Sequence, residues 1–157
     1  FVIIDSNTQR ILSDSNFNQK KELCYSAAKN MNVENLCVKS KIGEHDIQSL
    51  SDDELSVSKH VIEENIRVVK AAQFLKSNGA EEFGKLMTES HMSLSKYYKV
   101  STLELDKLVD LANSFGALGS KLTGAGFGGA IVTLVKKELV EELKKYILDN
   151  YPNAKFI

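Results

Sequence analysis

The chain has 157 residues, 43% of them apolar, which is enough to bury one core of ordinary size, so we expect a single domain over residues 1–157. Twenty basic and twenty-one acidic residues leave a net charge of −1, without a basic stripe, and this disfavours nucleic acid and anionic membranes as partners. No apolar run approaches the roughly 20 residues that a membrane-spanning helix needs.

The first third of the chain predicts a strand followed by a helix. Phe1 to Ile4 form a β-rich run that stops at the turn-forming Asp5-Ser6-Asn7, which is typical of a buried strand. From Asn18 to Met31 the apolar residues follow the spacing of one helical face, namely Leu23, Cys24, Ala27, Ala28 and Met31. Residues 32–58 are less regular, and we expect their acidic run Asp52, Asp53 and Glu54 to be solvated.

Two helices are predicted next. Lys59 to Ser77 repeats helical spacing through Ile62, Ile66, Val69 and Ala72, and Asn78-Gly79 is expected to end the helix with a glycine. Glu81 to Tyr97 predicts a helix whose acidic first turn suits the helix dipole. Its inner stripe would consist of Phe83, Leu86, Met87, Ser90 and Leu94.

The last third predicts two further helices and three strands. Ser101 to Glu104 reads as a capping box that opens a helix ending at Phe115-Gly116, with Leu105, Leu108, Val109 and Ala112 facing inward. Strands are expected at Lys121 to Thr123 and at Ala130 to Val135. Leu139, Leu143, Ile147 and Tyr151 mark a final amphipathic helix, which Pro152 ends before a closing strand.

This order of elements is strand, several helices, strand, strand, helix, strand. It is the βαββαβ frame of an α+β, ferredoxin-like sandwich, with extra helices inserted in the first crossover.

The stretch "GSKLTGAGFGGAIVTLV" at residues 119–135 concentrates glycine. Gly124, Gly126 and Gly129 satisfy G-x-G-x-x-G, but a strand follows them, whereas a dinucleotide-binding loop opens a helix. Two interpretations stay open. The loop from Thr123 to Gly129 could curl its amides into an anion-binding nest, with hydroxyls from Ser120 and Thr123, or it could simply be a tight hairpin between closely packed backbones.

Several other motifs favour structural roles. Gly79, Gly84 and Lys85 have the spacing of a phosphate loop, but the segment between them is acidic and helical, which disfavours a phosphate. Ile42-Gly43-Glu44-His45 is expected to be a polar loop. Glu89 and His91 could serve as an acid and a base, but a structural histidine is the favoured interpretation. Tyr97 and Tyr98 are expected to pack at a helix end.

The cysteines and the two ends of the chain give further indications. Cys24 and Cys37 are a single possible pair, which favours free thiols in a reducing compartment and hence the cytoplasm. The chain opens on "FVIID" without methionine and closes on "AKFI". Natural termini are usually polar and loose, so these ends indicate a piece of a longer polypeptide.

The glycine-rich stretch resembles the third conserved motif of the galactokinases, members of the GHMP family of small-molecule kinases. The resemblance covers nearly the whole chain, because further segments also resemble galactokinase segments in the same order: "FVIIDSN", "KHVIEENIRV", "FGKLMTESHMSLSKYYKVS" and "LELDKLVDLA". It implies the C-terminal domain of a galactokinase.

The resemblance implies ATP- and Mg²⁺-dependent phosphorylation of galactose at its C1 hydroxyl. The family's sugar motif, phosphate loop, catalytic aspartate and catalytic arginine belong to an N-terminal half that this chain does not contain. The partners implied are therefore that half and a small sugar, the isolated chain is expected to be inactive, and the protein is expected to be a monomer. "IGEH" mimics part of the sugar motif but stands outside the family's order.

The implied site residues lie in two places. The loop residues Thr123, Gly124, Ala125, Gly126, Phe127, Gly128 and Gly129 would support the ATP-phosphate loop. Phe17 stands where many galactokinases carry a sugar-binding tyrosine, which leaves N-acetylgalactosamine open as the substrate. Two other possibilities also stay open, a non-catalytic sugar and ATP sensor and a free-standing interaction module that has lost the chemistry.

Overall fold

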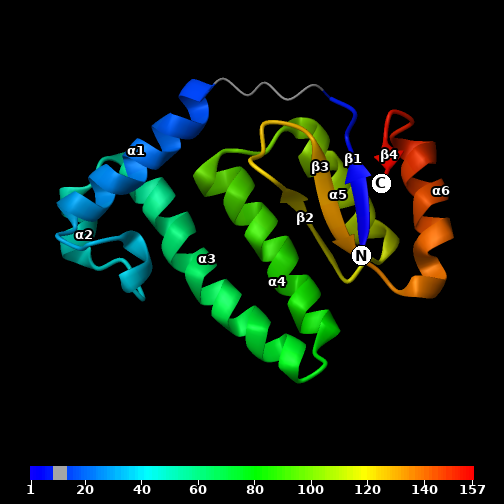
Figure 1. Cartoon of the computed structure of the whole chain (residues 1–157), viewed down its shortest axis with the longest axis horizontal. Helices are drawn as coiled ribbons and strands as arrows, with labels where there is room; N and C mark the ends of the chain where they lie inside the picture. Colours follow the sequence, from blue (N-terminus) through cyan, green and yellow to red (C-terminus); the bar gives the residue numbers. More distant parts are fainter. Residues whose placement is uncertain (9–13) are drawn as a thin grey trace.

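A four-stranded antiparallel sheet organises the molecule (Figure 1). The computed structural model describes residues 1–8 and 14–157, and only the backbone of residues 14–17. The strands are β1 (Val2–Asp5), β2 (Gly119–Thr123), β3 (Ala130–Leu134) and β4 (Lys155–Phe156). Their order across the sheet is β2-β3-β1-β4, and each neighbouring pair is antiparallel. This topology confirms the expected ferredoxin-like βαββαβ frame.

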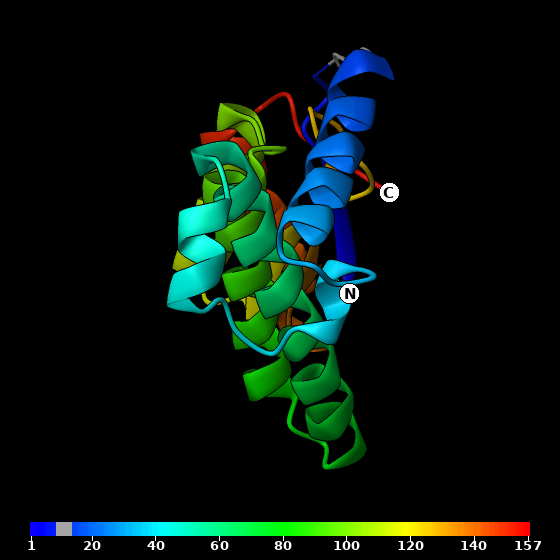
Figure 2. The same ribbon diagram turned by 90° about the vertical axis from the view of Figure 1, so that its left-hand side faces the viewer.

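Among the described residues, five helices lie between β1 and β2, four of them inserted and one belonging to the βαββαβ frame, and a sixth follows β3. The inserted helices are α1 (Asp14–Asn30), α2 (Glu44–Ser49), α3 (Asp52–Lys76) and α4 (Ala80–Ser93), and the others are α5 (Leu103–Phe115) and α6 (Val140–Asn150). Short 3-10 turns cover Leu36–Val38 and Lys137–Leu139, and one π-helical turn covers Leu94–Tyr98. The paired α3 and α4 extend well past the sheet in both views (Figures 1 and 2).

The main core lies between one face of the sheet and the helices α5 and α6. Val2 and Ile4 of β1 alternate with the exposed Ile3, so the predicted strand is buried on one face only. The inward stripe expected for residues 105–112 is confirmed, since Leu105, Leu108, Val109 and Ala112 are all buried. A smaller core joins α1 to α3 through Ala27, Ala28, Met31, Leu36 and Ile62.

Helix α4 covers the free edge of the sheet at β2. A Cβ on Gly84 would lie 2.2 Å from Leu118 O, so glycine alone permits this approach of helix to strand. The strand's outward N–H groups are satisfied by side chains of the helix. Ser120 N–H donates to Thr88 Oγ1 (3.3 Å) and Leu122 N–H donates to His91 Nδ1 (3.2 Å). An edge that would otherwise be open to another strand is thereby closed.

The segment 32–58 is more ordered than its sequence indicates. It contains α2 and the first turns of α3, which begins at Asp52 and not at Lys59. Ser51 caps α3 by accepting from Glu54 N–H, while the Glu54 carboxylate accepts from Ser51 N–H. Glu54 also accepts from Ser26 and Asn30 of α1, and it is only 7% exposed. The expectation that Glu54 is solvated is therefore wrong, because a capping box buries it.

Four other local predictions need correction. The "IGEH" stretch is a loop only at Ile42 and Gly43, since Glu44 and His45 begin α2 and Gly43 N–H donates to Asp46 Oδ2 (2.8 Å) at its N-terminus. The left-handed residue after α3 is Asn78 (φ 57°), whereas Gly79 has a φ of −80°. The helix predicted to run to Tyr97 changes to a π-helical turn after Ser93. The capping box predicted at Ser101 to Glu104 is wrong, because the N-cap of α5 is Thr102, whose side chain accepts from Leu105 N–H.

Candidate functional site

The loop between β2 and β3 is held almost entirely in left-handed backbone conformations. The φ angles are 82° at Gly124, 81° at Gly126, 58° at Phe127, 112° at Gly128 and 87° at Gly129. Such angles strain any residue with a Cβ, so four glycines are required by the path of the chain. The hairpin is confirmed, because the loop joins the paired strands β2 and β3, whereas the anion-binding nest stays a prediction.

One side of the loop rests on the segment that follows the π-helical turn. A Cβ on Gly126 would lie 2.2 Å from Val100 O, which leaves no room for any other residue. Phe127 N–H donates to the same carbonyl (2.7 Å). Glycine at position 126 is thus needed for the close approach of two backbones as well as for its φ angle.

The other side of the loop is bound to the end of β1. Ser6 donates to Gly129 O through both its N–H (2.8 Å) and its Oγ (2.7 Å), and Ser6 is fully buried. This role of Ser6 cannot be read from the sequence, in which Asp5-Ser6-Asn7 indicates only a turn. The contact joins residues 123 positions apart, a separation that no local pattern reports.

The outer part of the loop is open to solvent. Gly124 and Ala125 are exposed, while Gly126, Gly128 and Gly129 are buried. Among the described residues, Phe127 is the only one from Gly124 to Gly129 whose N–H donates to a backbone oxygen of the protein. The exposed amides that could meet an anion such as a phosphate are therefore those of Gly124 and Ala125.

The two hydroxyls expected beside the loop behave differently. Thr123 is half-buried where the loop begins. Ser120 is fully buried, and its Oγ donates to Thr133 Oγ1 (3.1 Å) within the sheet. The expectation that Ser120 adds a hydroxyl for an anion is therefore wrong, because this side chain is already engaged.

His91 is a structural histidine, as the sequence favoured, and Glu89 is exposed. His91 is 4% exposed, its Nδ1 accepts from Leu122 N–H, and its Nε2 lies 3.0 Å from Asp106 Oδ1. Burial lowers the pKa of His91, although the neighbouring Asp106 opposes that shift. Asp106 also accepts from Ser95 Oγ (2.9 Å) and Ser101 Oγ (2.5 Å). Asp106 was not anticipated as a partner, because Asp106 and His91 lie on different helices.

The tyrosines at the end of the π-helical turn make mainly packing contacts, as predicted. Tyr98 packs against the main core and its ring lies 4.7 Å from that of His60. Tyr97 Oη accepts from Lys59 Nζ (2.9 Å), which lowers the pKa of Tyr97.

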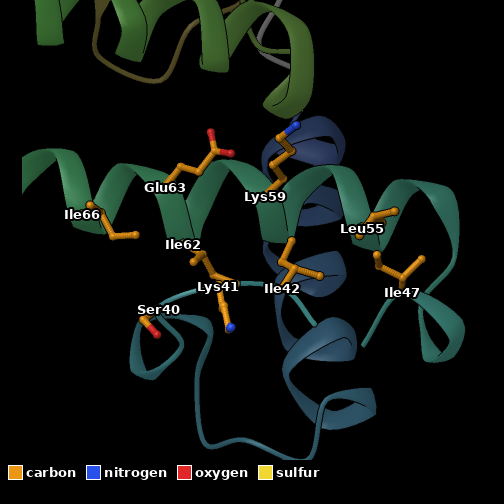
Figure 3. A pocket seen from close by; sticks show the side chains of 9 residues that line it. All are labelled: Ser40, Lys41, Ile42, Ile47, Leu55, Lys59, Ile62, Glu63 and Ile66. Atoms are coloured by element: carbon orange, nitrogen blue, oxygen red, sulfur yellow. The ribbon is translucent and has the colours of Figure 1, made fainter. Parts of the chain in front are cut away.

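A hollow lies between α3 and residues 40–47 (Figure 3). It has a volume of about 470 Å³ and is walled chiefly by apolar side chains of α3 and of residues 40–47, including Ile42, Ile47, Leu55 and Ile62. Lys59 and Glu63 turn their charged ends away from Ile42. The hollow holds no set of groups suited to chemistry, so it does not compete with the loop as a functional site.

The role predicted for Phe17 in binding the sugar is not tested by the structure. Phe17 falls in α1, but its side chain lies outside the described residues. Within the described part of the chain, no three His, Cys, Asp or Glu side chains gather into a metal site. Over the same residues, no helix is both long enough and apolar enough to cross a membrane.

Comparison with known proteins gives consistent matches. Residues 71–153 match the family model described as GHMP kinases C terminal. A galactokinase of Clostridium acetobutylicum is 40% identical over 96% of this chain, which spans 40% of that protein's length. The crystal structure of Lactococcus lactis galactokinase complexed with galactose superposes on 99% of the chain with a TM-score of 0.86 and 29% identity. Mevalonate kinase of Methanococcus jannaschii also superposes, with a TM-score of 0.54 and 29% identity.

Proposed function

Because this chain belongs to the GHMP kinases, we propose that it is the C-terminal part of a galactokinase, which transfers a phosphoryl group from ATP to the C1 hydroxyl of galactose. The observation that carries the proposal is the superposition of 99% of the chain on a galactokinase with a TM-score of 0.86. The chain covers only 43% of that structure, so the activity is proposed for a longer native protein that also holds an N-terminal half.

The glycine loop would contribute to this reaction by positioning. Phosphoryl transfer depends on orienting the reactants and on stabilising charge at the phosphates. The free amides near the exposed Gly124 and Ala125 suit a nearby phosphate group or a backbone that binds one. We propose that Thr123 to Gly129 support the ATP-phosphate loop of the other half, and that Phe17 lies near the sugar.

The donor set of the described residues does not suit Mg²⁺. No cluster of three acidic, histidine or cysteine side chains occurs among them, and the loop offers N–H donors where a cation needs oxygen ligands. We therefore propose that any Mg²⁺ is held by the ATP phosphates and by the N-terminal half. This chain would supply loop backbone and no metal ligand.

Two alternatives concern the substrate and the chemistry. Phe17 lacks the hydroxyl that a tyrosine would offer to a sugar, a bond that contributes roughly 0.5–1.5 kcal/mol. N-acetylgalactosamine is therefore the second candidate substrate. A non-catalytic sensor of sugar and ATP would bind both ligands without turnover. As compartment we propose the cytoplasm, because Cys24 and Cys37 are both free thiols.

The first experiment is to determine the intact mass of the native gene product with an antibody to this domain. A mass of twice 17.4 kDa or more is expected. That protein is then assayed with ATP and either galactose or N-acetylgalactosamine, and galactose phosphorylation is the expected activity. A product near 17.4 kDa would contradict the proposal and would favour a free-standing interaction module.

A further inference from the structure

The glycine loop is bound at Leu122 and at Val100, and both contacts lead to one carboxylate. Leu122 immediately precedes Thr123, where the loop begins, and its N–H is held by His91. Val100 carries the carbonyl that accepts from Phe127, and it immediately precedes Ser101. His91 and Ser101 both contact Asp106 Oδ1. Asp106 thus lies at the junction of two arms, one through His91 to Leu122 at the start of the loop and one through Ser101 to Val100 beneath its middle.

The first arm, from Asp106 through His91 to Leu122, can form with only one tautomer of His91. Leu122 lies on the edge strand β2, so its outward N–H has no neighbouring strand to bond. Nδ1 can accept this N–H only if Nδ1 carries no proton. A carboxylate beside Nε2 fixes the proton there, because a carboxylate accepts a hydrogen bond and cannot donate one. Asp106 therefore selects the tautomer of His91 that can hold β2.

The second arm positions the backbone of Val100, on which the loop rests. Ser101 Oγ donates to Asp106 Oδ1 (2.5 Å) and Ser95 Oγ donates to Asp106 Oδ2 (2.9 Å), so the carboxylate ties both ends of the segment 95–101 to α5. Val100 is buried within that segment, directly against Gly126. A shift of Val100 would be transmitted to Gly126, since no space separates the two backbones.

We propose that Asp106 is a positioning residue for the glycine loop, acting on its start through His91 and Leu122 and on its middle through Ser101 and Val100. The proposal rests on the proposed function in one respect, because the loop is taken to support ATP. Asp106 itself has a side chain that is 37% exposed and lies on α5, and nothing in its contacts requires it to touch a substrate.

The test uses the native full-length protein and the substitution Asp106→Asn, which keeps the size of the side chain. An amide can donate to Nε2 and thereby move the histidine proton to Nδ1, where it opposes Leu122 N–H. Thr88→Val is the matched control, because Thr88 caps the same edge strand two residues earlier, at Ser120. The comparison separates a general weakening of the α4–β2 contact from loss of the specific contacts that run from Asp106 through His91 to Leu122.

Two measurements are made on each variant. For Asp106→Asn we expect the KM for ATP to rise about tenfold, with the KM for galactose changed by less than about twofold, since an altered loop weakens nucleotide binding specifically. Amide hydrogen exchange should quicken by about tenfold or more at Leu122 and Phe127, whose N–H groups are bonded to His91 and Val100. Thr88→Val should quicken exchange at Ser120 and leave the KM for ATP within about twofold.

A pair of histidine variants covers the case in which Asp106→Asn fails to fold. His91→Asn places an amide oxygen near the position of Nδ1, so it should raise the KM for ATP less than His91→Gln does. The proposal is overturned if Asp106→Asn and Thr88→Val have equal effects on the KM for ATP, or if the two histidine variants do. If the wild-type protein does not phosphorylate galactose, the proposed function fails, yet faster exchange at Leu122 and Phe127 in Asp106→Asn still decides whether Asp106 positions the loop.

Discussion

Gly126 shows how a single residue can be fixed by two independent constraints. Its φ of 81° is strained for any residue with a Cβ, and the added atom would also lie 2.2 Å from Val100 O. Gly116 at the end of α5 has a similar constraint on φ, at 108°, but a Cβ there would meet nothing within 4 Å. The two glycines therefore separate backbone strain from steric exclusion.

We expect Gly126→Ala to lower the free energy of unfolding of this chain by about 3 kcal/mol or more, since overpacking adds to the strain. Gly116→Ala should lose only about 1–2 kcal/mol, because strain acts alone. Urea denaturation of both variants measures the difference. Equal losses would show that the Val100 contact is not limiting.

His60 is a buried histidine that makes the stability of the protein depend on pH. It is 6% exposed, and its Nδ1 is hydrogen-bonded to Ser93 Oγ (2.9 Å). Burial lowers the pKa of His60 to about 4, although Glu64 opposes the shift. Between pH 6.5 and about 4 the unfolded chain binds a proton at this site that the folded chain does not, so stability falls as the pH falls.

The expected slope from His60 is up to about 1.4 kcal/mol per pH unit within that window. His91 also has a lowered pKa and adds to the slope of the wild type, so the comparison must be with His60→Gln, in which His91 remains. Unfolding free energies of the two proteins should converge as the pH is lowered toward 4. Parallel curves would mean that His60 is protonated in the folded state.

At the scale of elements, the contact between α4 and β2 depends on glycine. Alanine is a better helix former than glycine by about 1 kcal/mol, so Gly84→Ala would stabilise an isolated helix. Here the new Cβ would lie 2.2 Å from Leu118 O, and we expect a net loss of about 1–3 kcal/mol in the free energy of unfolding.

Lys85→Ala is the control for this prediction, because Lys85 is the exposed neighbour on the same helix. It should change stability by less than about 0.5 kcal/mol. Thermal or urea unfolding of Gly84→Ala and Lys85→Ala measures the change in the free energy of unfolding for each variant. A stabilising Gly84→Ala would show that α4 can move away from the sheet without cost.

The elements that could be predicted from the sequence are those with a periodic pattern of apolar residues. Helix α5 and the strands were predictable because Leu105, Leu108 and Ala112 repeat with helical spacing and the strands alternate or branch at Cβ. Segment 32–58 was not, because Glu54 is buried by a capping box whose partners Ser26 and Asn30 lie on another helix. Periodicity reports which side of an element is apolar, and it carries no information on polar groups that are buried in pairs.

The candidate site also has one part that could be predicted from the sequence and one part that could not. The glycine loop was recognisable because φ angles above zero require a residue type that can be read in sequence. Its anchors were not recognisable, because Ser6, His91 and Asp106 reach it by contacts between distant segments. A glycine motif therefore locates a site, while the side chains that hold the motif in shape need the structure.

At the scale of the whole molecule, the sheet and its helices present one loop with free amides. Phosphoryl transfer needs several groups around the phosphates, and the chain spans only 40% of a galactokinase that is 40% identical to it. Within the described part of the chain no acidic, histidine or cysteine cluster could hold a metal, and loop amides alone offer little binding energy, since a Kd of 1 μM requires about −8.2 kcal/mol.

We therefore predict that the isolated 157-residue chain binds neither ATP nor galactose with micromolar affinity, whereas the native full-length protein binds both. Isothermal titration calorimetry on both proteins is the measurement. Micromolar binding of ATP by the isolated chain would place the phosphate site on the glycine loop itself and not on a neighbouring loop that it supports. In that case Gly126→Ala should abolish the heat of binding, because the loop could no longer lie against Val100.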